Sequence, residues 1–185
     1  MKDGYIKVKA VSPRLEVGGV SFNKEEIVKE IKASSAEGVK ILVFPELTLT
    51  GVSAGEMAYS GVILNACEKA LLNIKFATQG SDILVFVGAP LRYKDNNYSC
   101  AVAIKSGEIL GVVPKLGKLP FFKDFINIGD EKYPFGTDLL FSCKEICDLT
   151  VGVIIGDTVE NPSPKGFFLC ENGATVIVNL SGASE

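Results

Sequence analysis

The chain has 185 residues, of which 47% are hydrophobic, and its 22 acidic and 19 basic residues give a net charge of −3. This length suffices for one domain with a real core, so we expect a single domain over residues 1–185. The two signs of charge are mixed along the chain, which argues against nucleic acid or an anionic membrane as a partner. No apolar block approaches the roughly 20 residues of a membrane helix. The N-terminus has no apolar secretion signal, and we expect a cytoplasmic protein.

The reactive residue types are few. Histidine is absent, and the five cysteines form no CxxC pair. The absence of histidine excludes Ser-His and Cys-His nucleophile pairs and most zinc sites, so no metal site is expected. An odd number of cysteines fits free thiols in a reducing compartment, where most of them behave as small buried hydrophobes. Any chemistry must therefore use Glu, Asp, Lys, Cys, Ser or Tyr.

The first quarter of the chain predicts a strand, a helix and a second strand. Tyr5–Val11 alternates apolar and polar residues, which is typical of a strand. Asn23 is in position to cap a helix, with Glu26 three residues later completing a capping box. Gly38 predicts the end of that helix, and the apolar run Val39–Phe44 predicts a buried strand.

The middle of the chain predicts a helix followed by three strands. An apolar stripe with helical spacing covers residues 60–78, and Asp82–Val87 reads as another buried strand. Two antiparallel strands are predicted at Tyr98–Lys105 and Glu108–Val113, joined by a turn at Ser106-Gly107.

The last third begins with a predicted long loop over Pro114–Gly136, which is rich in Lys, Phe, Gly and Pro. Loops of that length inside a domain are often functional. Strands are predicted at Leu149–Ile155 and Thr175–Leu180, with a short helix opening near Asn161 between them. The order βαβαβββ, then β, α, β predicts a mixed α/β layout in which helices cover a sheet. A last strand with nothing packed behind it suggests a fragment of a longer domain.

Two charged residues follow predicted strands. Glu46 comes after an apolar strand and Pro45, where α/β folds place ligands and catalysts, and burial would suit its carboxylate to general-base work. Alternatively, Glu46 only caps the next turn. Lys115 follows a strand through Pro114 and could stabilise an oxyanion, or it could be a solvated loop lysine.

Several segments resemble one family, in that family's order along the chain. Val43–Gly51 resembles the segment that carries the catalytic glutamate of the nitrilase (carbon–nitrogen hydrolase) superfamily. Gly111–Lys115 resembles the segment with its lysine, and Val178–Ser181 resembles the strand after its nucleophile. Ala10–Arg14 and Asn97–Val102 point more narrowly to the glutaminase domain of glutamine-dependent NAD⁺ synthetases. The resemblance implies a nitrilase-type αββα sandwich with mixed sheets, incomplete at the C-terminus.

The resemblance also implies a mechanism. In the family, a Glu takes the proton of a Cys thiol, the Cys attacks the amide carbon, and a Lys holds the oxyanion. Here Glu46 and Lys115 would fill two of these roles. The ammonia released from glutamine would serve a synthetase domain that amidates nicotinic acid adenine dinucleotide. ATP and Mg would belong to that domain, so this domain would need no cofactor, and a homo-oligomer is expected.

The nucleophile of the family has no counterpart here. The stretch that matches the family's elbow is Val151–Asp157, and the position of the cysteine is Gly156. Cys147 precedes that strand and Cys170 follows on the next helix, so neither lies at the elbow. Glu46 and Lys115 could then simply pair with each other.

The expected pocket differs at further positions. A family glutamate is replaced by Ile154, a second glutamate falls at about Asn127, and a hydroxyl-bearing aromatic becomes Phe122. A tyrosine after the glutamate segment becomes Val52. The set expected to contact a substrate at the predicted pocket is Phe122, Val52, Ile154, Asp157 and Ser181.

Three hypotheses follow. The first is a non-hydrolysing glutaminase-like domain kept for contact with an ammonia-using synthetase domain. The second is a carbon–nitrogen hydrolase of another amide with an unusual nucleophile, such as Ser181 or a cysteine of another subunit. The third is a binding module whose cavity, lined by Val52, Phe122 and Ile154, takes a more apolar ligand.

Overall fold

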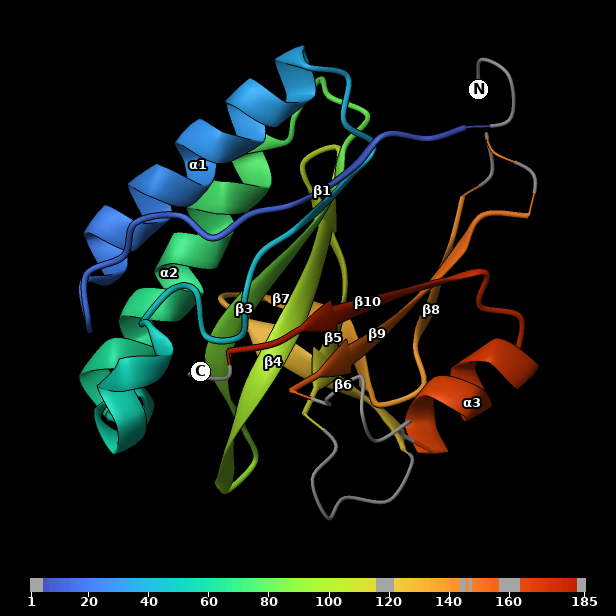
Figure 1. The fold of residues 1–185 in the computed structure, drawn as a ribbon. Coiled ribbons are helices and arrows are strands. Elements are labelled where there is room, and N and C mark those ends of the chain that lie inside the picture. Colours follow the sequence, from blue (N-terminus) through green and yellow to red (C-terminus); the bar gives the residue numbers. More distant parts are fainter. Residues whose placement is uncertain (1–4, 116–121, 144–145, 147, 157–163, 183–185) are drawn as a thin grey trace.

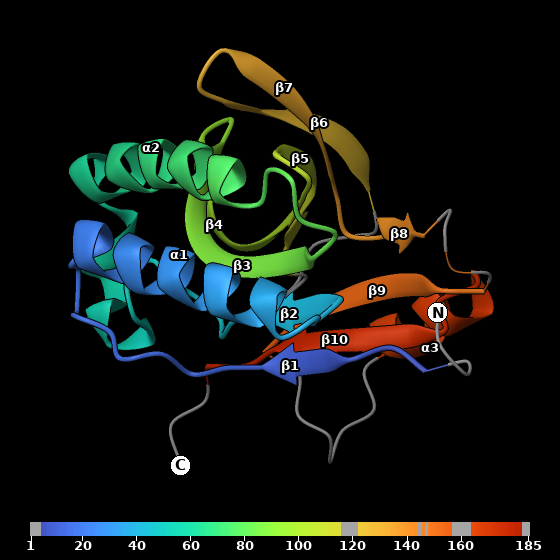
Figure 2. The same cartoon turned by 90° about the horizontal axis from the view of Figure 1, so that it is seen from above.

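A computed structural model describes the chain except residues 1–4, 116–121, 144–145, 147, 157–163 and 183–185. The described residues form four layers in the order helices, sheet, sheet, helix (Figures 1 and 2). The expected αββα sandwich with mixed sheets is therefore confirmed. No helix in the described ranges is long and apolar enough to cross a membrane.

The larger sheet has seven strands in the order β1-β2-β3-β4-β5-β7-β6. Its strands β1, β2 and β3 are parallel, and β3, β4 and β5 form an antiparallel meander. The bounds are β1 Val8–Ala10, β2 Ile41–Val43, β3 Leu84–Tyr93, β4 Asn96–Lys105, β5 Glu108–Pro114, β6 Lys123–Ile128 and β7 Glu131–Gly136. The expected turn at Ser106-Gly107 joins β4 to β5 and has positive φ at both residues.

Two helices cover one face of this sheet, and the smaller sheet covers the other (Figure 2). The helices are α1 (Val20–Ala36) and α2 (Gly61–Ala77), preceded by the short helix η1 (Val52–Tyr59). The smaller sheet has the order β10-β9-β8, and α3 (Pro164–Glu171) lies on its outer side. Its strands are β8 (Leu140–Ser142), β9 (Thr150–Ile155) and β10 (Val176–Leu180).

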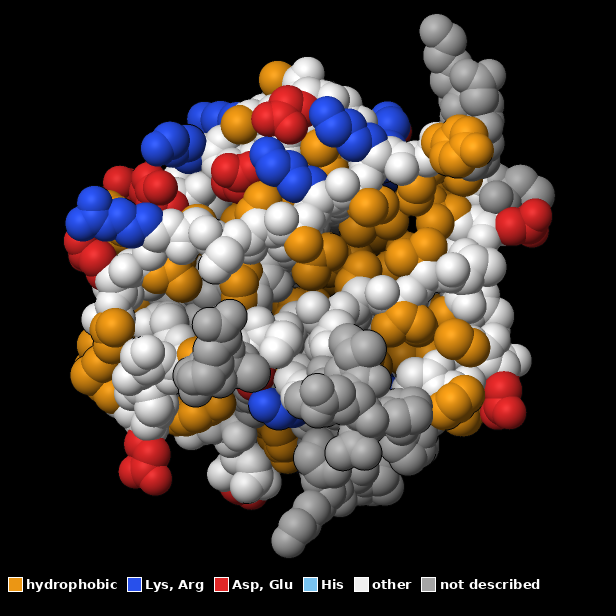
Figure 3. Space-filling view, viewed as in Figure 1, with side chains coloured by type: hydrophobic (Ala, Val, Ile, Leu, Met, Phe, Trp, Pro, Cys, Tyr) orange, Lys and Arg blue, Asp and Glu red, His pale blue; other side chains and the backbone are white. Residues whose placement is uncertain are grey.

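Alternation along the strands gives each sheet two different faces, and two hydrophobic clusters result. On β4, Cys100, Val102 and Ile104 face the helices, whereas Ala101 and Ala103 face the smaller sheet. The second cluster fills the space between the sheets, with Phe86 packed edge-on against Phe141 at 5.6 Å between ring centroids. In the space-filling view, hydrophobic side chains line a hollow between β1 and the smaller sheet (Figure 3).

One predicted boundary is wrong, because Asn23 is not a helix cap. Helix α1 begins three residues earlier, with Gly19 in the cap position, and Asn23 is completely buried. Its side-chain amide accepts from the N–H of Glu16 and donates to the carbonyls of Glu16 and Leu49. Asn23 therefore ties the loop before α1 to the loop after β2, a tertiary role that local spacing does not reveal.

The predicted long loop over Pro114–Gly136 is also wrong in its second half, which forms the β6-β7 hairpin. Ile126 and Ile128 are buried, and so are Tyr133 and Phe135 across the turn. This alternation, on both sides of Gly129-Asp130, was a readable hairpin signal. The short strand β8 was also missed, because three residues carry too little periodicity.

Candidate functional site

Glu46 is held at the end of β2 by a close approach between two backbones. The chain after Phe44 crosses β3 at Gly88, where an added Cβ would lie 2.2 Å from the carbonyl oxygen of Pro45. Only glycine at position 88 permits this contact. Leu47, which follows Glu46, is buried and has φ +52°, a conformation that L side chains disfavour. The surrounding contacts therefore hold this loop in one conformation, which fixes the direction of the Glu46 carboxylate.

Lys115 reaches this carboxylate from the end of β5. Its Nζ lies 3.0 Å from both Oε1 and Oε2 of Glu46. Glu46 is 8% exposed, whereas the side chain of Lys115 is 44% exposed. The expected pairing of these two residues is confirmed. Lys115 is thus both exposed and paired, and the carboxylate of Glu46 bonds to Lys115.

Gly156 lies directly against this pair. An ideal Cβ on Gly156 would be 2.6 Å from Lys115 Nζ and 3.2 Å from Glu46 Oε2. Strict alternation from Val153 and Ile155, which face the larger sheet, would turn residue 156 outward. Its φ of +74° ends the alternation and directs the Cβ position into the space between the sheets. Position 156 is therefore an elbow aimed at Glu46 and Lys115, and it carries no side chain.

Two further residues, Val52 and Gly182, adjoin the pair. Val52 is 42% exposed, and its Cγ2 lies 2.3 Å from the Cβ position of Gly182, which in turn is 3.3 Å from Glu46 Cβ. Val52 thus borders Glu46 through Gly182, and its contact with a substrate remains a prediction. Ser181 follows β10 and is exposed.

Sequence reasoning missed Tyr59 and Ser99. Burial raises the pKa of Tyr59, and the negative charge of Glu46 raises that pKa further, so the phenol lies in the field of the carboxylate. Ser99 is the cross-strand neighbour of Lys115, whose N–H donates to the Ser99 carbonyl at 2.8 Å. Ser99 Oγ is buried and has no hydrogen-bond partner among the described residues. Tyr59 comes from a segment with no recognised motif, whereas Ser99 lies within Asn97–Val102 and is placed beside Lys115 by the strand register.

Other predicted site residues lie elsewhere or outside the described residues. The structure places Ile154 on the outer face of β9, because its neighbours Val153 and Ile155 face inward. Phe122 stacks on Tyr93 at 6.3 Å between ring centroids and packs against the cluster under the helices. Asn127 is exposed on β6. Asp157 falls outside the described residues. The structure therefore does not bring Val52, Phe122 and Ile154 together around one cavity.

The described cysteines do not supply the missing nucleophile. Burial raises the pKa of the Cys67 thiol to about 12 and raises that of Cys100 as well, so both stay protonated. Cys143 follows β8, and Cys170 is exposed on α3. Cys147 falls outside the described residues. Within the described ranges, no cluster of three or more Cys, Asp or Glu residues could hold a metal ion.

Three comparisons with known proteins bear on this geometry. No model of a protein family matches the chain. Glutamine-dependent NAD(+) synthetase of Mycobacterium leprae is 33% identical over 195 residues, covering 97% of this chain and 28% of the relative. The chain therefore spans less than a third of the length of this relative.

Solved structures with a similar fold include a synthetase and an amidase. A glutamine-dependent NAD(+) synthetase from Cytophaga hutchinsonii superposes with a TM-score of 0.78 at 23% identity, over 97% of this chain and 30% of that chain. An amidase from Nesterenkonia superposes with a TM-score of 0.70 at 12% identity, over 98% of this chain and 66% of that chain. In that structure, the acetamide moiety of fluoroacetamide is added covalently at the active site cysteine.

The chain has the nitrilase fold. Its curated homologues are glutamine-dependent NAD(+) synthetases, and its structural neighbours include other members of the nitrilase superfamily. Within this fold, Glu46 and Lys115 keep a carboxylate and an ammonium in contact at the elbow. The residue of this chain at the elbow is a glycine.

Proposed function

We propose that this chain is a glutaminase-type domain of an NAD⁺ synthetase-like protein that no longer hydrolyses glutamine. The similarity to glutamine-dependent NAD(+) synthetases over 97% of the chain supports the first half of this proposal. Its partner would be an ammonia-using synthetase domain, as the names of the relatives suggest. We place this protein in the cytoplasm, where a reducing environment keeps its thiols free.

The observation that carries the second half is the glycine at the elbow. A nucleophile must project from position 156, because an added Cβ there lies against both Lys115 Nζ and Glu46 Oε2. Glycine offers no atom that can bond to an amide carbon. Without a thiol, Glu46 has no proton to take, and the carboxylate is neutralised by Lys115 instead. What remains is a polar contact between loops of the sandwich.

The pair would serve as a catalytic apparatus only if a thiol were restored. A thiol at position 156 would transfer its proton to Glu46, and its sulfur would form a bond to the amide carbon. The C–N bond would break, and the proton would leave with ammonia. Lys115 would stabilise the oxyanion through its positive charge. Because the atoms that an added Cβ would meet are the far end of this flexible, half-exposed side chain, Lys115 can shift to make room for it.

The test restores the thiol by Gly156→Cys. A chloromethyl ketone analogue of glutamine forms an S–C bond with a thiolate and releases chloride, and peptide mapping by mass spectrometry locates the adduct. We expect an adduct at position 156 in Gly156→Cys that excess glutamine suppresses. The natural protein should carry no adduct that glutamine suppresses.

Two controls separate the thiol from its surroundings. Gly156→Ala introduces the same Cβ at φ +74° without sulfur, so it reports the cost of the backbone strain in a thermal melt. Gly156→Cys combined with Glu46→Gln keeps the thiol but removes the base, and it should react more slowly. A glutamine-suppressible adduct in the natural protein, on any residue, would overturn the proposal.

A further inference from the structure

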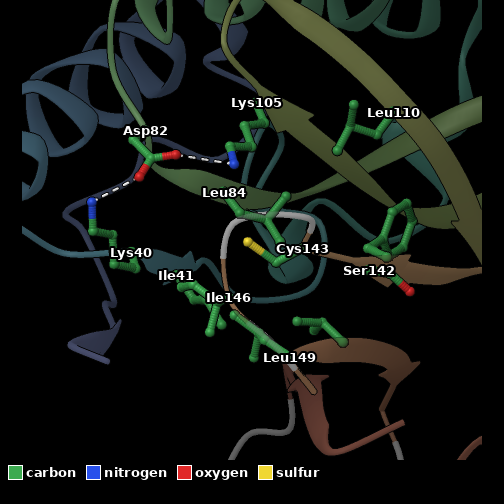
Figure 4. A pocket seen from close by; sticks show the side chains of 12 residues that line it. Lys40, Ile41, Asp82, Leu84, Lys105, Leu110, Ser142, Cys143, Ile146 and Leu149 are labelled. Atoms are coloured by element: carbon green, nitrogen blue, oxygen red, sulfur yellow. Dashed lines mark hydrogen bonds and ion pairs between the residues drawn. The ribbon is translucent and has the colours of Figure 1, made fainter. Parts of the chain in front are cut away.

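The two ends of the sandwich differ in whether their polar side chains have partners. At the end where β2 and β3 begin, Asp82 lies beside a pocket and bonds to Lys40 at 2.8 Å and to Lys105 at 3.0 Å (Figure 4). At the elbow end, Ser99 Oγ is buried and has no hydrogen-bond partner among the described residues. A buried hydroxyl without a partner destabilises a fold, so this one requires an explanation.

Ser99 faces the space between the two sheets. Its strand neighbours Tyr98 and Cys100 face the helices, so alternation turns Ser99 toward the smaller sheet. Lys115 lies directly opposite on β5 and shares this face, because Val113, two residues earlier, also packs between the sheets. Opposite residues of an antiparallel pair have Cβ atoms about 5 Å apart. The ammonium of Lys115, on a long flexible stem, can therefore reach the hydroxyl.

The end of Lys115 now lies where a side chain at position 156 would be. An ideal Cβ on Gly156 would be 2.6 Å from Lys115 Nζ and 2.8 Å from Lys115 Cε, closer than real Cβ atoms approach other heavy atoms. The elbow itself is held in place, because the N–H of Gly156 donates to the carbonyl of Leu180 at 3.0 Å. Any residue other than glycine at this position must therefore displace the end of the lysine.

We propose that Ser99 is a positioning residue for Lys115. When residue 156 carries a side chain, the ammonium moves off that position and donates to Ser99 Oγ while it stays bound to Glu46. An ammonium has three N–H donors, and the Glu46 carboxylate takes at most two of them, so one is left for the hydroxyl. This inference rests on the proposed function in one respect, namely that position 156 is the place of the nucleophile.

The experiment measures thermal melts of Ser99→Ala in two backgrounds, the natural protein and Gly156→Ala. In the natural protein the substitution removes a hydroxyl without a partner, so it should not lower the melting temperature. In Gly156→Ala it removes the acceptor of the displaced ammonium, and it should lower the melting temperature by about 4 °C. Neither variant needs a thiol or glutamine, so this result does not depend on whether the natural protein hydrolyses glutamine.

Controls separate this coupling from general effects on stability. Ser34 is also buried, but it donates to Glu30 at 2.9 Å on α1, so Ser34→Ala should lower the melting temperature equally in both backgrounds. Gly156→Asn repeats the comparison if Gly156→Ala does not fold, because Asn tolerates positive φ better. A crystal structure of the folded variant should show Lys115 Nζ within about 3.2 Å of Ser99 Oγ.

A kinetic readout tests the positioning role itself. In Gly156→Cys, adding Ser99→Ala should lower the maximal rate of reaction with the chloromethyl ketone about fivefold, because Lys115 is then held less firmly beside the oxyanion. The concentration of the reagent at half-maximal rate should stay the same, since Ser99 is not expected to contact it. A change in that concentration alone would contradict a positioning role.

Two further results would overturn the proposal. The first is an equal effect of Ser99→Ala on the melting temperature in the natural protein and in the variant with a side chain at position 156. The second is a structure of that variant in which Lys115 turns to solvent and Ser99 Oγ stays without a partner.

Discussion

Of the lysine–glutamate pairs that join separate elements among the described residues, two have opposite burial. In the elbow pair, the Glu46 side chain is 10% exposed and the Lys115 side chain is 44% exposed. In the pair that joins α2 to β7, the Lys75 side chain is 7% exposed and the Glu131 side chain is 54% exposed. The buried member is thus the carboxylate in one pair and the ammonium in the other.

The two pairs also differ in the polar groups around them. Lys75 also donates to Tyr133 Oη at 3.2 Å, and Tyr133 donates to Glu131 Oε2 at 2.7 Å, so the three groups satisfy one another. This cluster is complete, and it fastens a helix to the β6-β7 hairpin. The elbow pair instead adjoins a glycine, and Ser99, whose carbonyl accepts from the Lys115 N–H, has a buried hydroxyl without a partner among the described residues. The same two residue types complete a structural cluster in one place and, in our proposal, are what remains of a catalytic site in the other.

We expect the largest difference in stability between the two single variants of one pair at the elbow pair. Lys115→Met leaves the Glu46 carboxylate buried and unpaired, and we expect a loss of about 2 kcal/mol, below the ~3–5 kcal/mol of fully buried pairs. Glu46→Gln leaves a lysine that can turn to solvent, and we expect a loss below ~1 kcal/mol. Urea denaturation of both variants at neutral pH measures the difference. Equal losses would show that burial does not set the asymmetry.

The order should reverse in the helix pair. Glu131→Gln leaves the Lys75 ammonium buried without a counter-charge, whereas Lys75→Met replaces it by an apolar side chain of similar length. We expect Glu131→Gln to lower the melting temperature more than Lys75→Met. Parallel thermal melts of the two proteins test this. A larger loss in Lys75→Met would indicate that the ammonium itself, through Tyr133, stabilises this contact.

A third ion pair, between Lys94 and Asp124, has both members exposed and so extends the comparison of buried and exposed charges. Hydrogen bonds from Tyr93 and then Lys94 lower the pKa of Asp124 to about 2. Because the folded pKa is below the ordinary value of about 4, the stabilisation is complete above pH ~4 and disappears as pH falls through about 2. Asp124→Asn should flatten the acid side of the stability profile between these values. An unchanged profile in denaturation experiments from pH 5 to pH 2 would contradict it.

The smallest effect tests whether Tyr59 senses the elbow pair. Burial raises the pKa of Tyr59 first, and the charge of Glu46 adds to it. Glu46→Gln should therefore lower the pKa of Tyr59 without returning it to the ordinary value. A titration of the tyrosine ring carbons by NMR measures the shift, with Tyr133 as the reference, since its pKa responds to burial and to Glu131. If the pKa of Tyr59 does not change, Tyr59 does not belong to the site.

Local signals predicted most of the strands, whereas the sandwich and the position of the elbow were predicted from the resemblance to the nitrilase superfamily. Apolar runs predicted β2, β3, β9 and β10, and the segment around Val43–Gly51 located Glu46. The residues that sequence reasoning missed or misplaced depend on tertiary contacts. Local spacing predicts Asn23 as a cap, but Asn23 ties two loops together, and Ser99 is placed beside Lys115 by the β4-β5 register.

Strand parity explains the remaining misplacement. Ile154 lies two residues before Gly156, so sequence distance alone puts both at the elbow. The structure puts Ile154 on the outer face and turns Gly156 inward by its positive φ. The residue pattern does not predict this change of direction, because a glycine is compatible with both the extended backbone of a strand and a positive φ.

We propose that a chain with Glu46 and Lys115 in contact, but with Gly156 at the elbow, does not hydrolyse glutamine. The most direct measurement is the rate of glutamate release from glutamine by the purified protein, compared with its Glu46→Ala variant under the same conditions. We expect no release above background in either protein. Release by the natural protein above that of Glu46→Ala would contradict it.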